Sequence, residues 1–535
     1  MPYSSQNGKT FIKQLVESAK PTTVLDVGAG SGTYAKFLNI DKQNLTAVEI
    51  HEPYLEQFSL MEYYDKIIVE DIRNYQPDHY DLILLGDILE HMSVQEAKLV
   101  LEKCRKSSNL TIVSIPLGYY PQDEYQGNPY EKHVTDNWSH NEFIKIFGEP
   151  YQHHTEGEIG VYVYKKLKIC VYAIAKNESQ FVERFCAAAR DADCIMIADT
   201  GSTDSTVALS RQHGAIVHEI SVQPWRFDHA RNAALMLVPA DIDICISLDL
   251  DEELQPGWRE AIEAVWKENT TRLRYKFDWG AGIVFYYEKI HHRKGYRWHH
   301  PCHEYPVPDS RTTEVWATTD VLLAIHKPDP SKSRGQYMDL LELAVEEDPR
   351  CPRNAFYYAR ELGFHRRWQD SIDACKKYLA MPEATWENER CYAMRCAGRA
   401  TSELGLWHDA LKWFRLACAE APGTREPWVE LADCCYRLSM WEECYAASTT
   451  ALKILDKQLV YTVDPKVWGS KTPDLAAISA YRIGLFIKAI EYGTDAIQLS
   501  PADTRLKSNM NFYLTSNPLE KPINTDRNFD PVISV

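Results

Sequence analysis

The stretch Ile246-Ser247-Leu248-Asp249-Leu250-Asp251-Glu252-Glu253 joins a short apolar run to an Asp-x-Asp pair. Apolar residues followed at once by acids predict a buried strand that ends where the loops of a sheet begin. Two carboxylates at such a point can hold a hard divalent cation, and the cation can hold a diphosphate. Alone the pair is a weak signal, because Asp-x-Asp arises by chance in any acidic chain of this size.

Three further motifs precede this stretch. The sequence AIAKNE at 173–178 ends one predicted strand, DTGSTDST at 199–206 ends the next, and FDHARN at 227–232 opens a helix. Alternating strands and helices predict a parallel sheet whose ligand lies at the carboxyl ends of the strands. We therefore expect a donor site formed by these residues: Ala173, Asn177, Glu178, Asp199, Ser202, Asp204, Arg231 and Asp249. Ordinary turn and capping chemistry is the alternative reading for the Asp residues of the second motif and for Arg231.

With these four motifs in this order, residues 167–329 resemble the family 2 glycosyltransferases with a GT-A fold. The resemblance implies inverting transfer of a sugar from a nucleoside diphosphate sugar, expected to be UDP-linked, to a hydroxyl acceptor. A glycan, a protein and a modified nucleic acid are the acceptors considered. It further implies that Mn²⁺ or Mg²⁺ is held by Asp249, Asp251 and His326, and that Glu304 is the catalytic base.

A glycine-rich loop, DVGAGSG at 26–32, follows a short apolar strand near the amino terminus. Glycines allow a sharp turn and close approach to a ligand, while the next helix offers its amino end. Acids follow the later strands. Residues 1–166 thereby resemble the class I S-adenosylmethionine (SAM)-dependent methyltransferases, which implies that the cofactor contacts Asp26, Gly28, Gly30, Gly32, Glu49, Asp71, Ile72, Gly86 and Asp87.

Two histidines, His91 and His133, are candidate general bases for a hydroxyl acceptor, because a neutral imidazole is well poised for that role near pH 7. The alternative is that His91 caps a helix and His133 only packs. Whether this first domain transfers methyl groups or survives as a cofactor-binding scaffold stays open at the level of sequence.

From residue 334 onward the sequence predicts paired amphipathic helices. The breaks ELG at 361–363, ELGLW at 403–407 and RLSMW at 437–441 are alike, and the last two lie 34 residues apart. This pattern resembles tetratricopeptide repeats. Such arrays present a concave face, so a protein partner or a homodimer is expected through the repeats.

The composition sets further limits. A net charge of −17 argues against a protein that grips duplex DNA over a broad basic face. The 14 cysteines show no Cys-x-x-Cys pair, no run of 18 apolar residues occurs, and the first ten residues lack the apolar core of a secretory signal. A cytoplasmic enzyme without a membrane span is therefore expected.

Together these patterns predict a multidomain enzyme: an α/β Rossmann-like methyltransferase at 1–166, an α/β GT-A glycosyltransferase at 167–333 and all-α tetratricopeptide-like repeats at 334–535. Glycosyl transfer is the expected activity, and the attached SAM-binding domain would methylate the sugar or the acceptor. Two alternatives remain. One is a scaffold protein with a degenerate transferase core that recruits partners through its repeats, and the other is an enzyme whose main activity is methylation.

Overall fold

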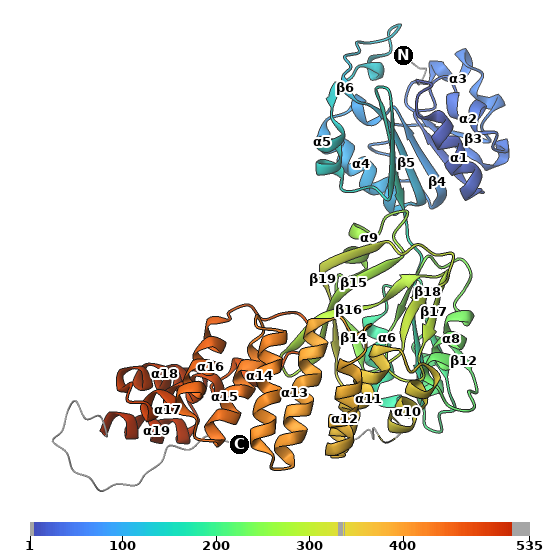
Figure 1. Ribbon diagram of the computed structural model, residues 1–535. Coiled ribbons are helices and arrows are strands. Elements are labelled where there is room, and N and C mark those ends of the chain that lie inside the picture. The colour runs from blue at the N-terminus through green and yellow to red at the C-terminus, as the bar shows by residue number, and fades with distance from the viewer. Residues whose placement is uncertain (1–4, 330–334, 336, 516–535) are drawn as a thin grey trace.

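The computed structural model describes residues 5–329, 335 and 337–515. It has three parts in chain order: an α/β unit, a second α/β unit and an array of helices that extends to one side as an arm (Figure 1). The predicted boundary between residues 333 and 334 lies outside the described residues. The same holds for residues 1–4 of the first predicted domain and residues 516–535 of the last.

The first unit contains a seven-stranded sheet in the order β3-β2-β1-β4-β5-β9-β8. The first five strands of that order run parallel, and β9 and β8 close the sheet antiparallel. The strands are β1 (Val24–Val27), β2 (Leu45–Glu49), β3 (Lys66–Val69), β4 (Tyr80–Gly86), β5 (Ser108–Pro116), β8 (Gln152–Glu156) and β9 (Ile159–Lys165). The helices are α1 (Lys9–Ala19), α2 (Thr33–Leu38), α3 (Pro53–Gln57), α4 (Val94–Lys106) and α5 (His140–Phe147), and a two-stranded ribbon pairs β6 (Gly118–Tyr119) with β7 (Asn137–Trp138).

Apolar residues fill both faces of this first sheet. In β4, Leu82 and Leu84 belong to one buried cluster, while Ile83 and Leu85 belong to another. Successive side chains of a strand point to opposite faces, so a strand covered on both faces is apolar throughout. The polar side chains that a ligand could reach therefore lie mainly at the strand ends.

The second unit contains an eight-stranded sheet in the order β12-β11-β10-β13-β16-β15-β19-β14. Four strands are parallel, and β16 then pairs antiparallel with β13. The strands are β10 (Ile169–Ala175), β11 (Cys194–Asp199), β12 (Ile216–Glu219), β13 (Ile244–Ser247), β14 (Glu252–Leu254), β15 (Arg272–Gly280), β16 (Ile283–His292) and β19 (Trp316–His326). The helices are α6 (Ser179–Ala188), α7 (Thr206–Gln212), α8 (Phe227–Leu237) and α9 (Trp258–Val265), and a separate hairpin joins β17 (Tyr296–His299) to β18 (Tyr305–Pro308).

The third part is all helical, as predicted. Helix α10 (Tyr337–Glu347) precedes four helix pairs and a last helix: α11 (Pro352–Phe364) with α12 (Trp368–Leu379), α13 (Glu387–Glu403) with α14 (Trp407–Glu420), α15 (Arg425–Arg437) with α16 (Trp441–Lys453), α17 (Lys471–Arg482) with α18 (Phe486–Leu499), and α19 (Thr504–Thr515). Each pair turns at a residue with positive φ, namely Arg366, Gly405, Ser439 and Gly484. The first break was predicted one turn too early, because Gly363 still lies inside α11.

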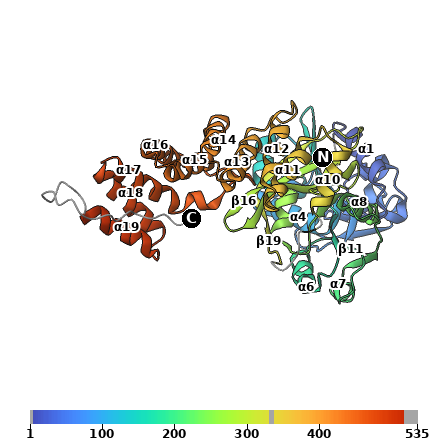
Figure 2. The same cartoon turned by 60° about the horizontal axis from the view of Figure 1, so that its bottom comes forward.

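The helical array packs directly on the second unit (Figure 2). One apolar cluster includes Trp225 and Cys302 of the second unit together with Leu341 and Phe356 of the array. The imidazole ring of His303 stacks on the ring of Tyr357, with 3.9 Å between ring centroids. The first helix pair therefore shares a core with the sheet that precedes it.

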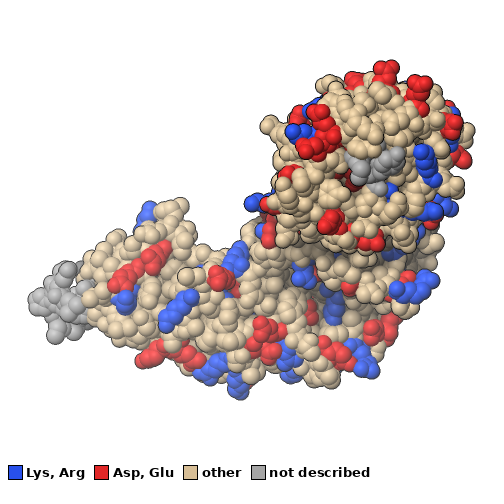
Figure 3. All heavy atoms as spheres, turned by 90° about the horizontal axis from the view of Figure 1, so that it is seen from above, with Lys and Arg blue, Asp and Glu red and all other residues tan. Residues whose placement is uncertain are grey.

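Acidic and basic side chains alternate over the face seen from above (Figure 3). Within the described residues, no helix is long and apolar enough to cross a membrane. All 14 cysteines are free thiols, and most are buried.

Candidate functional site

A pocket opens at the carboxyl edge of the first sheet. It is bounded by the glycine loop after β1, by the end of β2, by the turn after β4 and by the loop that precedes β7. Counting the solvent-filled space at its open mouth, the pocket encloses about 940 Å³.

Two glycines give this pocket its shape. The φ of Gly28 is 70°, and a Cβ at this position would lie 2.0 Å from Cδ1 of Ile88. A Cβ at Gly86 would lie 2.0 Å from the ring of Tyr34. Any larger residue would force the lining apart, so glycine is required at both positions.

Glu49 braces the glycine loop from the end of β2. One oxygen of its carboxylate accepts the N–H of Gly30 at 2.9 Å, and the other accepts the N–H of His51 at 2.8 Å. Burial raises the pKa of Glu49, and these two N–H donors oppose that shift. Because a carboxylate oxygen can accept more than one hydrogen bond, Glu49 can still accept from a ligand in the pocket.

The lining of the pocket is acidic. Four carboxylates face it, and the described residues that line it include no lysine or arginine. The acidic lining residues are Glu49, Asp87, Glu90 and Glu131. Such a lining favours a cationic ligand over a phosphate, because like charges in a partly buried site repel.

His91 and His133 lie together at the pocket. Their ring centroids are 4.9 Å apart, with an interplanar angle of 71°. Burial lowers the pKa of His91 to about 4, against the opposing effect of the hydrogen bond that its ring donates to the Lys132 carbonyl, and burial also lowers the pKa of His133. Both imidazoles are therefore neutral near pH 7, so each ring has a nitrogen that can accept a proton or bind a cation.

Four of the predicted cofactor residues lie outside the lining of the pocket: Asp26, Gly32, Asp71 and Ile72. The Asp26 carboxylate lies behind the loop and accepts the Tyr64 hydroxyl at 2.5 Å, and burial raises its pKa to about 7. Gly32 begins α2, and the Ile72 side chain is buried in the core. Asp71 is paired with Arg73 at 2.7 Å. The other predicted residues, Gly28, Gly30, Glu49, Gly86 and Asp87, all line the pocket.

A second cluster of charged residues lies at the carboxyl end of β13. The Arg231 guanidinium, from α8, is buried and pairs with Asp249 at 2.6 Å and with Glu304. It also donates to the hydroxyl of Ser247 at 3.1 Å. The structure thus brings together three predicted site residues: Arg231 of the donor site, Asp249 of the Asp-x-Asp pair and Glu304, the predicted base.

Lys289, from β16, supplies a second buried cation. Its Nζ lies 3.3 Å from Asp249 and 3.4 Å from Glu252. Burial would raise the pKa of Asp249, but the charges of Arg231 and Lys289 outweigh burial and hold that pKa below its usual range. Burial raises the pKa of Glu252 to about 7, despite the opposing charge of Lys289.

The three predicted metal ligands of this cluster are not gathered at one point. Asp251 lies 3.4 Å from Nε2 of His326, but Asp249 is drawn to Arg231 and Lys289. Within the described part of the chain, Asp249, Asp251 and His326 do not form a group whose ligand atoms all lie within 4.8 Å of one another. The side chains of Arg231 and Lys289 already neutralise Asp249, the carboxylate for which a cation was expected.

The loops after β10 and β11 form one hydrogen-bonded network. The Asn177 side chain accepts the N–H of Thr203 at 2.8 Å, and the N–H of Asn177 donates to Ser202 at 2.9 Å. The N–H of Glu178 donates to the Thr206 hydroxyl.

The two aspartates of the second loop hold the turn. The Asp199 carboxylate accepts the N–H groups of residues 201 and 202, and the Asp204 carboxylate accepts those of residues 206 and 179. The turn chemistry that was the alternative reading is therefore present.

Ala173, which was predicted to belong to the donor site, lies inside the sheet. It is fully buried within β10, where it is in register with Ile197 of β11. β10 lies between β11 and β13 in the middle of the sheet, so a nucleobase could pair only nearer the strand end.

Glu90 was given no individual role from sequence, and the contact of Lys289 with Asp249 was not predicted. Glu90 stands directly before His91, and an adjacent Glu-His pair at a strand end was a usable signal. Lys289 reaches Asp249 only because β16 pairs with β13, and no local pattern announces that pairing.

Comparison with known proteins bears on the first unit. A family model described as a methyltransferase domain matches residues 25–107. A search of curated proteins finds no match. The chain therefore contains a methyltransferase domain, and the match runs from the second residue of β1 through the end of α4.

Likenesses to solved structures are weak. The pilF protein of Pseudomonas aeruginosa is similar over 33% of this chain and 72% of that chain, at 13% identity and a TM-score of 0.27. A TPR protein of Thermus thermophilus is similar over 34% and 92%, at 17% identity and a TM-score of 0.25. The N-terminal domain of EvdMO1, determined with SAH and D-fucose, is similar over 30% and 84%, at 14% identity and a TM-score of 0.25. Likeness at this level does not bear on the activity of this chain.

Proposed function

We propose that the first unit is a SAM-dependent methyltransferase that acts on a hydroxyl acceptor. The observation that carries the proposal is the acidic pocket at the carboxyl edge of a sheet that matches a methyltransferase family model. A sulfonium cofactor carries positive charge and no phosphate, so it fits a lining with four carboxylates and no basic residue among those described.

Each part of the pocket has a separate task in this proposal. Glu49 accepts hydrogen bonds from the ribose hydroxyls, and the loop around Gly28 and Gly30 allows close approach of the backbone. SAM, when bound, supplies an electrophilic methyl group. Bound there, the cofactor would give this methyl group to the acceptor oxygen, and sulfur would keep the electron pair of the broken carbon–sulfur bond. The hydroxyl proton must leave, and His91 and His133 are the neutral bases nearest to the pocket.

The test is cofactor binding by the full chain. We expect calorimetry to give one SAM or SAH site, and Glu49→Gln to weaken it about tenfold or more, as for the loss of hydrogen bonds to a charged group. Glu52→Gln, at an exposed position three residues away, is the matched control and leaves affinity unchanged. No binding of either ligand at millimolar concentration would refute the proposal.

As a second candidate, the central unit is proposed to transfer sugar from a nucleoside diphosphate sugar to a hydroxyl acceptor. The specific observation in its favour is the cluster of Arg231, Asp249 and Glu304 at the carboxyl end of β13. Arg231 would meet the diphosphate, which in turn would release Glu304 to accept the proton of the acceptor. In the structure, which contains no donor, the Glu304 carboxylate is paired with Arg231.

Hydrolysis of nucleotide sugars tests this candidate. We expect slow hydrolysis of one donor, and a loss of about two orders of magnitude in transfer for Glu304→Gln. Running the screen with Mn²⁺, with Mg²⁺ and with chelator shows whether Asp249 and Asp251 use a cation or whether Arg231 and Lys289 suffice. If no donor is bound or hydrolysed in any condition, the binding-protein alternative takes its place.

A further inference from the structure

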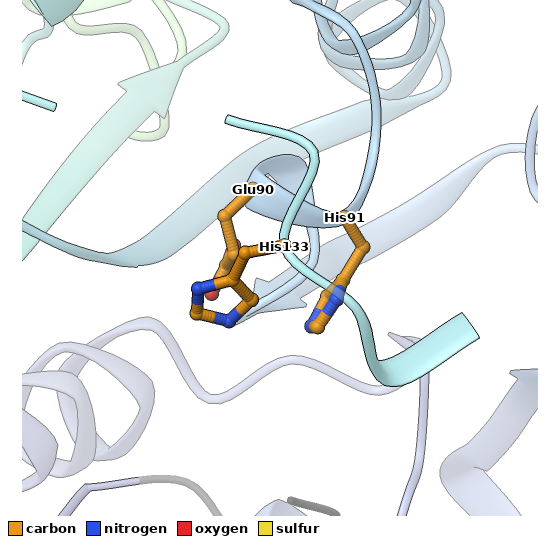
Figure 4. A group of neighbouring side chains, drawn as sticks. All are labelled: Glu90, His91 and His133. Carbon is orange, nitrogen blue, oxygen red and sulfur yellow. The ribbon is translucent and has the colours of Figure 1, made fainter. Parts of the chain in front are cut away.

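Three side chains of the methyltransferase pocket converge on one point: Glu90, His91 and His133 (Figure 4). One ligand atom of each lies within 4.8 Å of the other two. Among the described residues, no other group of three or more His, Cys, Asp or Glu side chains meets that distance. Glu90 and His91 come from the 3₁₀ turn Leu89–His91 after β4, and His133 comes from a loop more than 40 residues later.

Both imidazole rings are held with one nitrogen toward the convergence point. Nδ1 of His91 lies 3.1 Å from the carbonyl oxygen of Lys132, and Nδ1 of His133 lies 2.6 Å from that of Tyr120. A carbonyl oxygen can only accept, so each Nδ1 carries the hydrogen and donates it. The lone pair is therefore on Nε2 in both rings, which is the tautomer that a histidine ligand adopts when its other nitrogen is anchored.

Glu90 supplies the carboxyl group of this cluster, and burial raises its pKa well above the ordinary value, so a bound cation would favour the ionised form. Its side chain is buried, at 1% exposure, and Oε2 has no hydrogen-bond partner among the described residues. A buried carboxylate without a partner is strongly unfavourable. The backbone carbonyl of Glu90 accepts the N–H groups of Val134 and Thr135, at 2.9 and 3.0 Å, so the turn and the His133 loop are fixed to each other.

We propose that Glu90, His91 and His133 form a site for a divalent cation of the first transition row. The role of the cation rests on the proposed methyl transfer, but the geometry of its three ligands does not. Two imidazoles and one carboxylate suit Mn²⁺, Fe²⁺ or Zn²⁺ better than Mg²⁺ or Ca²⁺, which prefer oxygen ligands. Bonds of ~2.1 Å place ligand atoms ~3 to 4 Å apart, so a small inward rotation of the side chains completes the site.

The site changes how the acceptor would be activated. Three protein ligands leave positions open on the cation, and a hydroxyl bound there loses its proton far more readily than in water. The proton then passes to solvent, and the histidines serve as ligands and not as bases. Asp87 and Glu131, which also line the pocket, add to its attraction for a cation.

The experiment is a calorimetric titration of the chelator-treated full chain with Mn²⁺. We expect one site in the micromolar range, weakened about tenfold or more by Glu90→Gln and by His133→Asn, with Mg²⁺ binding at least tenfold more weakly than Mn²⁺. His79→Asn is the matched control, because His79 is an exposed histidine of the same unit that contacts Asn109. A titration of Asp251→Asn shows whether any of the measured Mn²⁺ binding takes place at the Asp-x-Asp pair instead.

The outcomes distinguish the two proposals. Absence of Mn²⁺ binding, or binding that Glu90→Gln and His133→Asn leave unchanged, overturns the cation site. SAM binding measured in chelator on the same preparations tests the methyltransferase separately, so its persistence means that only the cation site fails. If Glu90→Gln melts without cooperativity, His91→Gln is the substitute, and it must also lose Mn²⁺ affinity.

Discussion

The methyltransferase pocket and the cluster around Arg231 both gather carboxylates at the carboxyl edge of a sheet, but they neutralise them differently. Asp249 and Glu304 are matched by the buried guanidinium of Arg231, and Lys289 stands between Asp249 and Glu252. In the pocket, no lysine or arginine is among the described lining residues. A cluster that contains its own cations can be complete without a ligand, whereas an acidic pocket with no basic residue in its described lining favours a cation from outside.

The largest expected effect comes from breaking the matched cluster. Arg231→Met leaves Asp249 and Glu304 without their shared cation, so we expect the free energy of unfolding to fall by about 3 to 5 kcal/mol in urea denaturation. Arg211→Met is the control, because its pair with Glu219 is largely exposed and is worth under about 1 kcal/mol. Equal losses in the two variants would show that burial does not distinguish these pairs.

A smaller effect concerns pH. The pKa of Asp26 is about 7 in the folded chain against 3.8 as the ordinary value, because burial outweighs the Tyr64 hydrogen bond. Between pH 4 and 7 the folded protein keeps a proton that the unfolded chain has lost, so the free energy of unfolding falls as pH rises. Asp26→Asn should remove about 3 kcal/mol of this fall.

The measurement is a set of urea denaturation curves from pH 4 to pH 7.5 for the wild type and the variant. Asp41→Asn, at an exposed position of the same unit, should leave the slope as it is. An unchanged slope in Asp26→Asn would mean that Asp26 is ionised throughout this range.

In the pocket, we expect a substitution to raise the free energy of unfolding, whereas Arg231→Met lowers it. Glu90→Met replaces a buried carboxylate by an apolar side chain of similar length, so in chelator we expect the free energy of unfolding to rise by about 1 kcal/mol. With saturating Mn²⁺ the order should reverse, because only the wild type gains stability from the bound cation. Thermal melts with and without Mn²⁺ check both statements, and a variant less stable than the wild type in chelator would contradict the first.

The smallest effect is expected at Asp71. Its carboxylate is paired with Arg73 and does not line the pocket, so Asp71→Asn should change SAM affinity by less than about threefold, in contrast to Glu49→Gln. Stability should change by under about 1 kcal/mol, as for other exposed pairs. A loss of affinity equal to that of Glu49→Gln would restore Asp71 to the cofactor site.

Much of the fold was predictable because its signals are local. The apolar run that becomes β13, the glycine loop after β1 and the paired helices from α11 to α18 all follow from residues close in sequence. The predicted domain boundary between residues 166 and 167 stays a prediction, and so do the roles of individual site residues.

What escaped prediction depends on pairing over long distances. Ile246 of β13 is in register with Ile290 of β16, and this register alone brings Lys289 to Asp249. Asp71 was assigned to the cofactor by its place after a strand, but Arg73, two residues later, competes for it. Ala173 was assigned to the donor site by its place in the motif at 173–178, yet strands on both sides bury it.

The contact between the helical array and the loop of Glu304 has a consequence for unfolding. His303, the neighbour of Glu304, stacks on Tyr357, and its carbonyl oxygen accepts Nε of Arg353 at 3.1 Å. The loop and α11 must therefore form and dissolve together. Helices α18 and α19 lie at the far end of the array, where they pack on α17 and on each other, so we expect them to fray first. Hydrogen exchange should accordingly be fastest at the far end of the arm and slowest where α11 meets the central sheet.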